Sequence, residues 1–247
     1  MDSPRYLTKS RFKLAVECPT KLFYTGKHRE YRDSMEEDAF LAMLAEGGYQ
    51  VGTLAKLRYP DGIEIHEKGH AEAEAQTLNL LASDFVVLFE PAIRVGNLFI
   101  RIDILVKAGN HFELIEVKAK SYNSIAPEIV GSSGKIKADM LPYIQDAAFQ
   151  TLVLQRAYPG ATISTALMMP DKACIAPVDG INQMFKITSD STIELRVPTG
   201  IDAKALAETL LAKVDINSYV GQVLNQPLNF PGGMASIEDA VLTLILP

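Results

Sequence analysis

Two carboxylates and a lysine lie in one short segment, in positions where they could do chemistry together. The segment from Arg101 to Lys120 contains Asp103, Glu116 and Lys118, and apolar residues alternate with polar ones around them. This period of two predicts a β-hairpin that carries all three on one polar face, with a turn at Gly109-Asn110. Adjacent carboxylates repel each other unless a cation binds to them, and oxygen ligands suit a hard divalent ion. The pattern is typical of metal-dependent cleavage of phosphodiester bonds.

The same residues also allow an interpretation without chemistry. Asp103 could pair with Lys118 across the hairpin, and Glu116 with Arg101. Such exposed ion pairs contribute roughly 0.2–1 kcal/mol to stability. The hairpin pattern is compatible with both interpretations.

Composition indicates one globular protein with a sizeable core. The chain has 247 residues, of which 48% are hydrophobic and 22% charged. We found no apolar run near the roughly 20 residues that span a bilayer, and the first residues lack the apolar segment of a secretory signal. We therefore expect a soluble, cytoplasmic protein that does not bind membranes. The two cysteines, Cys18 and Cys174, are far apart in sequence and predict no disulfide framework.

The charge distribution limits how the chain could bind nucleic acid. The net charge of -6 argues against a protein that coats DNA by bulk electrostatics, because such binding needs clustered lysine and arginine. Positive charge is concentrated near the N-terminus, where Lys9, Arg11, Lys13 and Lys21 form a candidate phosphate-binding surface. The same residues could instead form an ordinary solvated helix face.

Hydrophobic periodicity and capping signals predict a mixed α/β protein. Helices are expected over residues 8–18, with Thr8 or Ser10 as the cap and Pro19 at the end, and over residues 35–57, 71–82, 142–157 and 202–214. Strands are expected at 85–89, 92–95, in the two arms of the hairpin, at 163–169 and at 184–187. Residues 121–137 are expected to form a loop or lid. This order predicts a central sheet with parallel and antiparallel pairs, flanked by helices and preceded by a helical section.

The order of these motifs resembles the PD-(D/E)XK nuclease superfamily, in particular its RecB-like and CRISPR-associated exonuclease branch. The shared order is a helical section, a hairpin with Asp103, the Glu116-Val117-Lys118 triplet and a helix carrying Gln150. Segments 7–24, 50–55, 101–105 and 146–150 are also similar to that branch. The likeness runs from Leu7 to about Thr188. It implies a RecB-like nuclease domain over 1–188, with a helical section at 1–83 and a restriction-endonuclease-like catalytic core at 84–188, and an extension of unknown role at 189–247.

The resemblance implies a function and a role for each matching residue. Asp103, Glu116 and the backbone carbonyl of Val117 would hold Mg²⁺ or Mn²⁺. Lys118 would orient the attacking water, and Gln150 would contact the DNA backbone or brace the site. The implied activity is hydrolysis of DNA in repair, recombination or defence, with DNA as the partner and a possible protein partner at the C-terminal extension.

The chain departs from the pattern of that branch at three places. A histidine ligand is expected on an early helix, but Gly48-Tyr-Gln-Val-Gly52 ends in glycine, and His66, Glu72 or Glu74 could replace it. No cysteine follows Cys174, so we expect no iron-sulfur cluster. Leu154 stands where a tyrosine is expected after Gln150. These departures leave open a second hypothesis, a catalytically inactive RecB-like module that binds nucleic acid or a partner protein.

Overall fold

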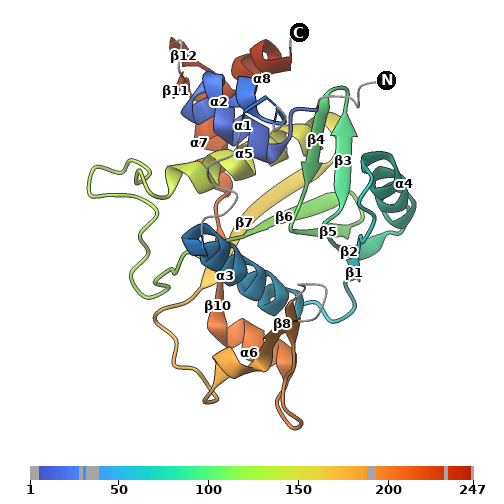
Figure 1. The fold of residues 1–247 in the computed structure, drawn as a ribbon, viewed down its shortest axis with the longest axis vertical. Helices are drawn as coiled ribbons and strands as arrows, with labels where there is room; N and C mark the ends of the chain where they lie inside the picture. The colour runs from blue at the N-terminus through green and yellow to red at the C-terminus, as the bar shows by residue number, and fades with distance from the viewer. Residues whose placement is uncertain (1–5, 28–29, 32–38, 188–192, 231–232, 246–247) are drawn as a thin grey trace.

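The computed structural model describes residues 6–27, 30–31, 39–187, 193–230 and 233–245. A six-stranded sheet lies at its centre, and Figure 1 shows how the helices surround it. The sheet has the order β1-β2-β5-β6-β7-β10. Its strands are β1 (Ile63–Glu64), β2 (Phe85–Phe89), β5 (Ile104–Ala108), β6 (His111–Val117), β7 (Thr162–Pro170) and β10 (Leu211–Asp215). The expected α/β architecture, with a mixed central sheet flanked by helices, is confirmed.

Both kinds of strand pairing occur in this sheet. β5 lies between β2 and β6 and is antiparallel to both, and β7 lies parallel to β6. β1 is parallel to β2, and β10 is antiparallel to β7. The tight turn between β5 and β6 falls at Gly109-Asn110 as predicted, and Gly109 takes the left-handed φ of 58° that glycine tolerates best. The parallel step from β6 to β7 requires a crossover, which α5 (Leu141–Ala157) provides.

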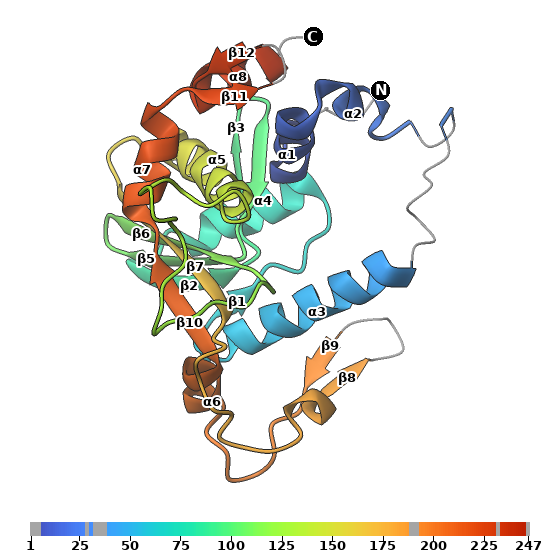
Figure 2. The same ribbon diagram turned by 90° about the vertical axis from the view of Figure 1, so that its left-hand side faces the viewer.

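Helices cover both faces of the sheet, because its strands are apolar on both sides. On one face, Leu114 and Leu167 pack in a core with Ile144 and Val153 of α5 and with Val220 of α7 (Asn217–Asn225). On the other face, α3 (Ala39–Lys56) and α6 (Ala203–Leu210) cover a second core that contains Leu54, Ile115 and Ala207. Figure 2 shows α3 running beneath the sheet, next to the hairpin of β8 (Phe185–Ile187) and β9 (Ile193–Leu195).

The N-terminal helices pack on α5. Thr8 caps α1 (Lys9–Glu17), its hydroxyl accepting a hydrogen bond from the backbone N–H of Arg11 at 3.3 Å. Phe12 is buried and stacks on Phe149 of α5 at 4.6 Å between ring centroids. Pro19 does end the first helix as predicted, but it also begins α2 (Pro19–Tyr24), where a missing N–H costs nothing.

A small hairpin and one further helix flank the main sheet beside α1. The hairpin consists of β3 (Ala92–Val95) and β4 (Leu98–Arg101), and α4 (His70–Leu80) packs against β3. Leu7 pairs with Leu98 in an isolated bridge, so the chain just before α1 is fixed to this hairpin. The strands at 85–89 and 92–95 and the helices near 71–82 and 142–157 occur as predicted, whereas residues 35–38 of the expected second helix lie outside the described residues.

The helix predicted over residues 202–214 was wrong in its last four residues, 211–214. Asp202 caps α6 as expected, accepting from the N–H of Ala205 at 3.1 Å, but the helix ends at Leu210. Residues 211–215 form β10 instead, because they pair with the free edge of β7 from Leu211 opposite Pro170 to Asp215 opposite Ala166. Tertiary pairing overrides the local helical pattern here.

The residues after 188 contribute to the same sheet and core. β10 is an edge strand of the six-stranded sheet. Ile216, Val220 and Val223 pack in the same core as the buried side chains of α5. The chain ends with the pair β11 (Leu228–Phe230) and β12 (Gly233–Ala235) and with α8 (Ile237–Ile245). The expected division at residue 188 therefore does not mark a break in the sheet.

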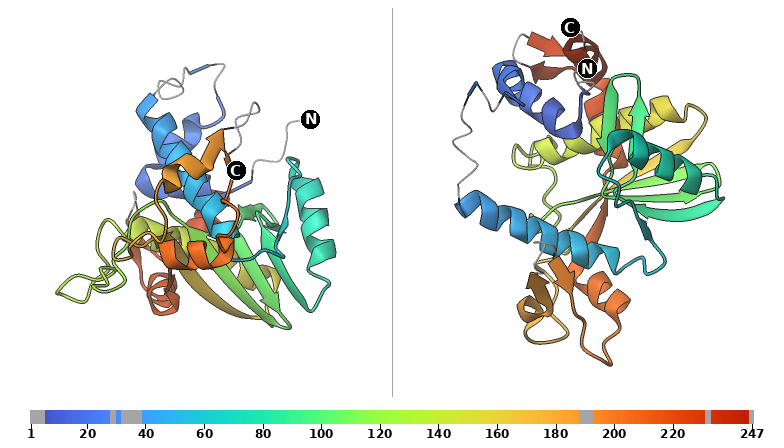
Figure 3. Two further views of the ribbon diagram at one scale, coloured as in Figure 1. Left: turned by 90° about the horizontal axis from the view of Figure 1, so that it is seen from below. Right: turned by 45° about the vertical axis from the view of Figure 1, so that its right-hand side comes forward.

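The segment between β6 and α5 is mostly irregular, as predicted for residues 121–137. It projects from the sheet and is tied at its base by the pairing of Tyr122 with Asp171 (Figure 3). Across the described part of the chain, every helix is too short or too polar to cross a membrane.

Candidate active site

Asp103 lies in the bend between β4 and β5, not within a strand. The alternating run around it is divided between two sheets, since β4 pairs with β3 while β5 joins the main sheet. The prediction of one hairpin arm through Asp103 was therefore wrong. The next residue, Ile104, pairs with Ile115, which leaves Asp103 next to the end of β6. Its Oδ2 accepts a hydrogen bond from the backbone N–H of Val117 at 2.7 Å.

Glu116 is fully buried, so the expectation of a polar hairpin face was also wrong. The side chains of Phe112 and Leu114 on the same face of β6 belong to the core under α5. Glu116 occupies the last position of that face, with an exposure of 0%. Its Oε1 lies 2.7 Å from Lys118 Nζ, and its Oε2 accepts a hydrogen bond from the side-chain amide of Gln150 at 2.7 Å.

Lys9 is the third partner of Glu116. Its ammonium donates to Glu116 Oε1 at 2.8 Å and lies 3.5 Å from Asp103 Oδ1. The lysine is the first residue of α1, and the Leu7 bridge and the Thr8 cap hold this turn beside the sheet. Lys9 was predicted to bind nucleic acid from a surface, but the structure brings it into the carboxylate site.

Asp146 completes this cluster. Lys118 Nζ lies 3.0 Å from Asp146 Oδ2 and 5.4 Å from the centre of the Tyr143 ring. Asp146 is nearly buried and lies one helical turn before Gln150 on α5. Sequence reasoning gave Gln150 a role on this helix but gave none to Asp146. The spacing of four residues to Gln150 was the signal that could have found it.

The cluster carries more negative than positive charge. Asp103, Glu116 and Asp146 supply three carboxylates, whereas Lys9 and Lys118 supply two ammonium groups. Burial, followed by the charge of Glu116, raises the pKa of Asp103. Burial alone would also raise the pKa of Glu116, but Lys9, Lys118 and the Gln150 amide together lower it. A further cation near Asp103 would relieve this excess.

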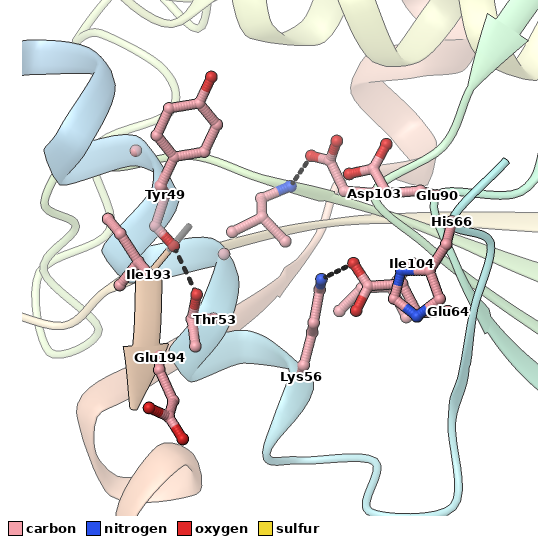
Figure 4. Close-up of a pocket in the computed structure, with 13 residues that line it drawn as sticks. Tyr49, Thr53, Lys56, Glu64, His66, Glu90, Asp103, Ile104, Ile193 and Glu194 are labelled. Carbon is pink, nitrogen blue, oxygen red and sulfur yellow. Dashed lines mark hydrogen bonds and ion pairs between the residues drawn. The ribbon is translucent and has the colours of Figure 1, made fainter. Parts of the chain in front are cut away.

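A pocket opens beside Asp103, between the end of the sheet and α3 (Figure 4). It has a volume of about 1050 Å³, and its lining from the end of the sheet consists of Glu90, Asp103, Ile104 and Val117. The rest of its lining consists of Gly48, Tyr49, Gly52, Thr53 and Lys56 of α3, together with Glu64, His66, Ile193 and Glu194. Substrate could approach the carboxylates from this side.

Gly52, the position at which the resemblance places a histidine, lines this pocket. Gly48 and Gly52 lie in the pocket wall, so a ligand on α3 at this spacing would face the site. Of the three proposed replacements, His66 lines the same pocket, while Glu74 is held by Arg94 at 2.7 Å. Glu72 is at the start of α4, beside Gly69. Of these three side chains, His66 is the one that shares the pocket with Asp103.

Glu90 is a residue that sequence reasoning missed. Among the described residues it is the one non-glycine residue with a positive φ, 56°, and its N–H donates to the carbonyl of Asp103 at 3.2 Å. Burial raises the pKa of its carboxyl group. Such strained backbone persists where the surrounding structure fixes it, and it is concentrated at functional sites. No sequence signal marked this position.

The remaining residues of the predicted phosphate-binding surface lie outside the cluster. Lys13 and Lys21 are exposed, and Lys21 pairs with Glu17 on the next helical turn at 2.8 Å. The guanidinium of Arg11 donates to the carbonyl of Tyr6 at 2.6 Å.

The exposed ion pairs of the alternative interpretation do not form. Lys118 pairs with Glu116 and Asp146, and Arg101 donates to the carbonyl of Glu67.

The donor set fits a magnesium or manganese ion in chemical type. Asp103 and Glu116 are oxygen donors that already share one cation, and the fully buried Gln150 Oε1 has no hydrogen-bond partner among the described residues. No set of three histidine, cysteine or acidic side chains that could hold a metal occurs in the described ranges. Mg²⁺ commonly binds through one or two carboxylates and keeps several waters, so two carboxylates are sufficient.

Comparison of the chain with protein-family models and with curated proteins returned no match.

Proposed function

We propose that this chain is a Mg²⁺- or Mn²⁺-dependent nuclease that hydrolyses DNA phosphodiester bonds on a restriction-endonuclease-like core. The observation that carries the proposal is the convergence of Asp103 and Glu116 on one ammonium group, at 3.5 Å and 2.8 Å, with Lys118 beside them. Two carboxylates and a lysine grouped around a cation position are what metal-assisted phosphodiester hydrolysis requires.

The order of elements around the site supports the same proposal. Asp103 precedes β5, the Glu116-Val117-Lys118 triplet ends β6, and Gln150 follows on α5 before the parallel strand β7. This is the order in which the PD-(D/E)XK resemblance places its acidic residue, its Glu-x-Lys triplet and its glutamine.

Each side chain then has a defined task. Asp103 and Glu116 would hold the divalent ion, together with the carbonyl of Val117. A bound ion would supply a Lewis acid that lowers the pKa of water and polarises a phosphoryl oxygen. Lys118, steadied by Asp146, offers a fixed positive charge to the phosphate as its negative charge grows. Gln150 fixes Glu116 Oε2 and so orients the carboxylate.

A second candidate function is a RecB-like module that binds nucleic acid or a partner protein without turnover. The specific observation in its favour is that the Lys9 ammonium already bridges both carboxylates, while Gly52 stands where the resemblance places a histidine. In that case the cluster is a buried ion-pair network that stabilises the fold.

The test is incubation of end-labelled linear DNA and closed circular DNA with the purified chain in Mg²⁺, Mn²⁺ or EDTA. The proposal expects cleavage with either ion and none in EDTA, and cleavage of the circle would indicate endonuclease action. Glu116→Gln, purified in parallel, controls for contaminating nucleases. DNA binding without cleavage under every condition would favour the second candidate.

A further inference from the structure

The position of Lys9 between the two carboxylates has a consequence for metal binding. Its ammonium contacts Glu116 Oε1 at 2.8 Å and Asp103 Oδ1 at 3.5 Å. A divalent ion held by the same two carboxylates would lie next to this ammonium group. Like charges a few ångströms apart repel each other more strongly in a protein than in bulk water, and a divalent ion is repelled more strongly than a unit charge. The two cations therefore compete for one position.

Each carboxylate keeps another partner when Lys9 is taken away. Glu116 retains Lys118 at 2.7 Å and the Gln150 amide at 2.7 Å. Asp103 retains the backbone N–H of Val117 at 2.7 Å. These interactions come from β6 and α5, which are parts of the sheet and its covering helix, so the geometry of the carboxylates does not depend on Lys9.

Lys9 itself is well placed to move. It belongs to the first turn of α1, and its side chain retains an exposure of 23%, whereas Glu116 retains 1%. The distance to Asp103 is longer than a hydrogen bond. A lysine side chain is a flexible chain of four carbons, so its ammonium group can move away from the carboxylates by bond rotation. The Thr8 cap and the Phe12 stacking meanwhile hold the helix in place.

We propose that Lys9 is a tethered cation that bridges Asp103 and Glu116 in the metal-free protein and leaves this position when a divalent ion binds. This inference rests on the proposed metal-dependent function and adds a control step to the same site. Lys9 reduces the repulsion between the two carboxylates until metal arrives, and it sets the concentration of metal at which the site fills.

The first experiment measures Mn²⁺ affinity from the electron paramagnetic resonance signal of the free ion, on the full chain without DNA. Lys9→Met should bind Mn²⁺ at least about tenfold more tightly than the wild type, because a repelling charge is removed. Lys9→Arg keeps the charge and should not bind more tightly than the wild type. Lys13→Met removes an exposed charge on the next turn of α1 and should change the affinity less than about twofold.

The second experiment uses the wild type alone, so it does not depend on the folding of a variant. An amine-acylating reagent is applied with and without Mn²⁺, and labelling of Lys9 relative to Lys13 is read by mass spectrometry. Lys9 should be protected without metal and become several-fold more reactive when Mn²⁺ is bound. Lys13 is exposed in both states and serves as the internal reference.

The outcomes separate this inference from the proposed function. Tighter Mn²⁺ binding by Lys9→Met and metal-induced labelling of Lys9 support the inference. Equal or weaker binding by Lys9→Met, or unchanged labelling while Mn²⁺ is bound, overturns it and leaves the metal site intact. If neither the wild type nor Lys9→Met binds Mn²⁺, both the inference and the metal-dependent function are overturned.

Discussion

The side-chain amide of Gln150 donates a hydrogen bond to Glu116 Oε2 over 2.7 Å, and both side chains are fully buried. This hydrogen bond joins the helix that crosses the sheet to the strand that carries the Glu-x-Lys triplet. It satisfies the one carboxylate oxygen of Glu116 that no lysine contacts in the described structure. A hydrogen bond to a buried charge is among the stronger kinds in proteins.

Removal of this amide should therefore destabilise the protein. Gln150→Leu keeps the volume of the side chain but leaves a buried carboxylate oxygen without a donor, so we expect a loss of about 1.5–3 kcal/mol. Urea unfolding followed by circular dichroism measures it. Gln155→Leu, at an exposed position on the same helix, is the matched control and should change the free energy of unfolding by less than about 0.5 kcal/mol. Equal effects of the two variants would show that the hydrogen bond to Glu116 contributes nothing.

Neutralising the two carboxylates should affect stability in opposite ways. The pKa of Glu116 is lowered in the folded protein, so its charged form contributes stability that is present at neutral pH and is lost as the pH falls. Glu116→Gln should cost about 3–5 kcal/mol at pH 7.5, the range for breaking a buried ion pair. The pKa of Asp103 is raised, so its ionisation opposes folding once the pH exceeds the unfolded value. Asp103→Asn should be at least as stable as the wild type.

Both variants are compared with the wild type by thermal unfolding in EDTA at pH 7.5 and again at pH 4. At pH 4 the difference between wild type and Asp103→Asn should shrink, since Asp103 is then largely protonated in the folded protein. A clear loss of stability in Asp103→Asn at pH 7.5 would mean that its charge is balanced in the metal-free protein, contrary to the excess negative charge of the cluster.

The exposed lysines of the N-terminal helices are still predicted to bind the phosphates of DNA. Lys13→Gln with Lys21→Gln should lower the slope of log K against log salt by about 0.7–0.9 for each phosphate that the protein no longer neutralises. The control is Lys186→Gln with Lys204→Gln, which removes the same charge from β8 and α6 at the other end of the molecule (Figure 1). Fluorescence anisotropy over a salt series measures both slopes. If the two double variants have the same slope, the exposed lysines of α1 and α2 belong to a solvated surface that does not bind DNA.

The local sequence was sufficient to predict most elements that hold the site. The turn at Gly109-Asn110, the helix with Gln150 and the cap at Asp202 follow from short-range rules of turns and helices, and all three occur. The pairing of Asp103 and Glu116 at the end of the sheet follows from the β5–β6 register. These features depend on residues close together in the sequence.

Features that depend on distant parts of the chain could not be predicted in this way. Residues 211–215 fit a helical pattern, but the open edge of β7 makes them a strand. The alternating run through Asp103 shows no local sign that β4 and β5 belong to different sheets. Lys9 looks like one cation of a basic helix, and only the pairing of Leu7 with Leu98 and the packing of Phe12 on Phe149 bring it to Glu116.

The most direct test of the proposed nuclease activity is the single-turnover cleavage rate of labelled DNA in Mg²⁺ for wild type, Asp103→Asn and Glu116→Gln. The exposed carboxylate Asp139, which pairs with Lys120 at 2.8 Å, provides Asp139→Asn as the matched control. We predict metal-dependent cleavage by the wild type and the control, and a loss of at least about 100-fold in both site variants, since each removes a proposed metal ligand. Wild-type rates in Asp103→Asn and Glu116→Gln, each shown to be folded by circular dichroism, would contradict the assignment of this site.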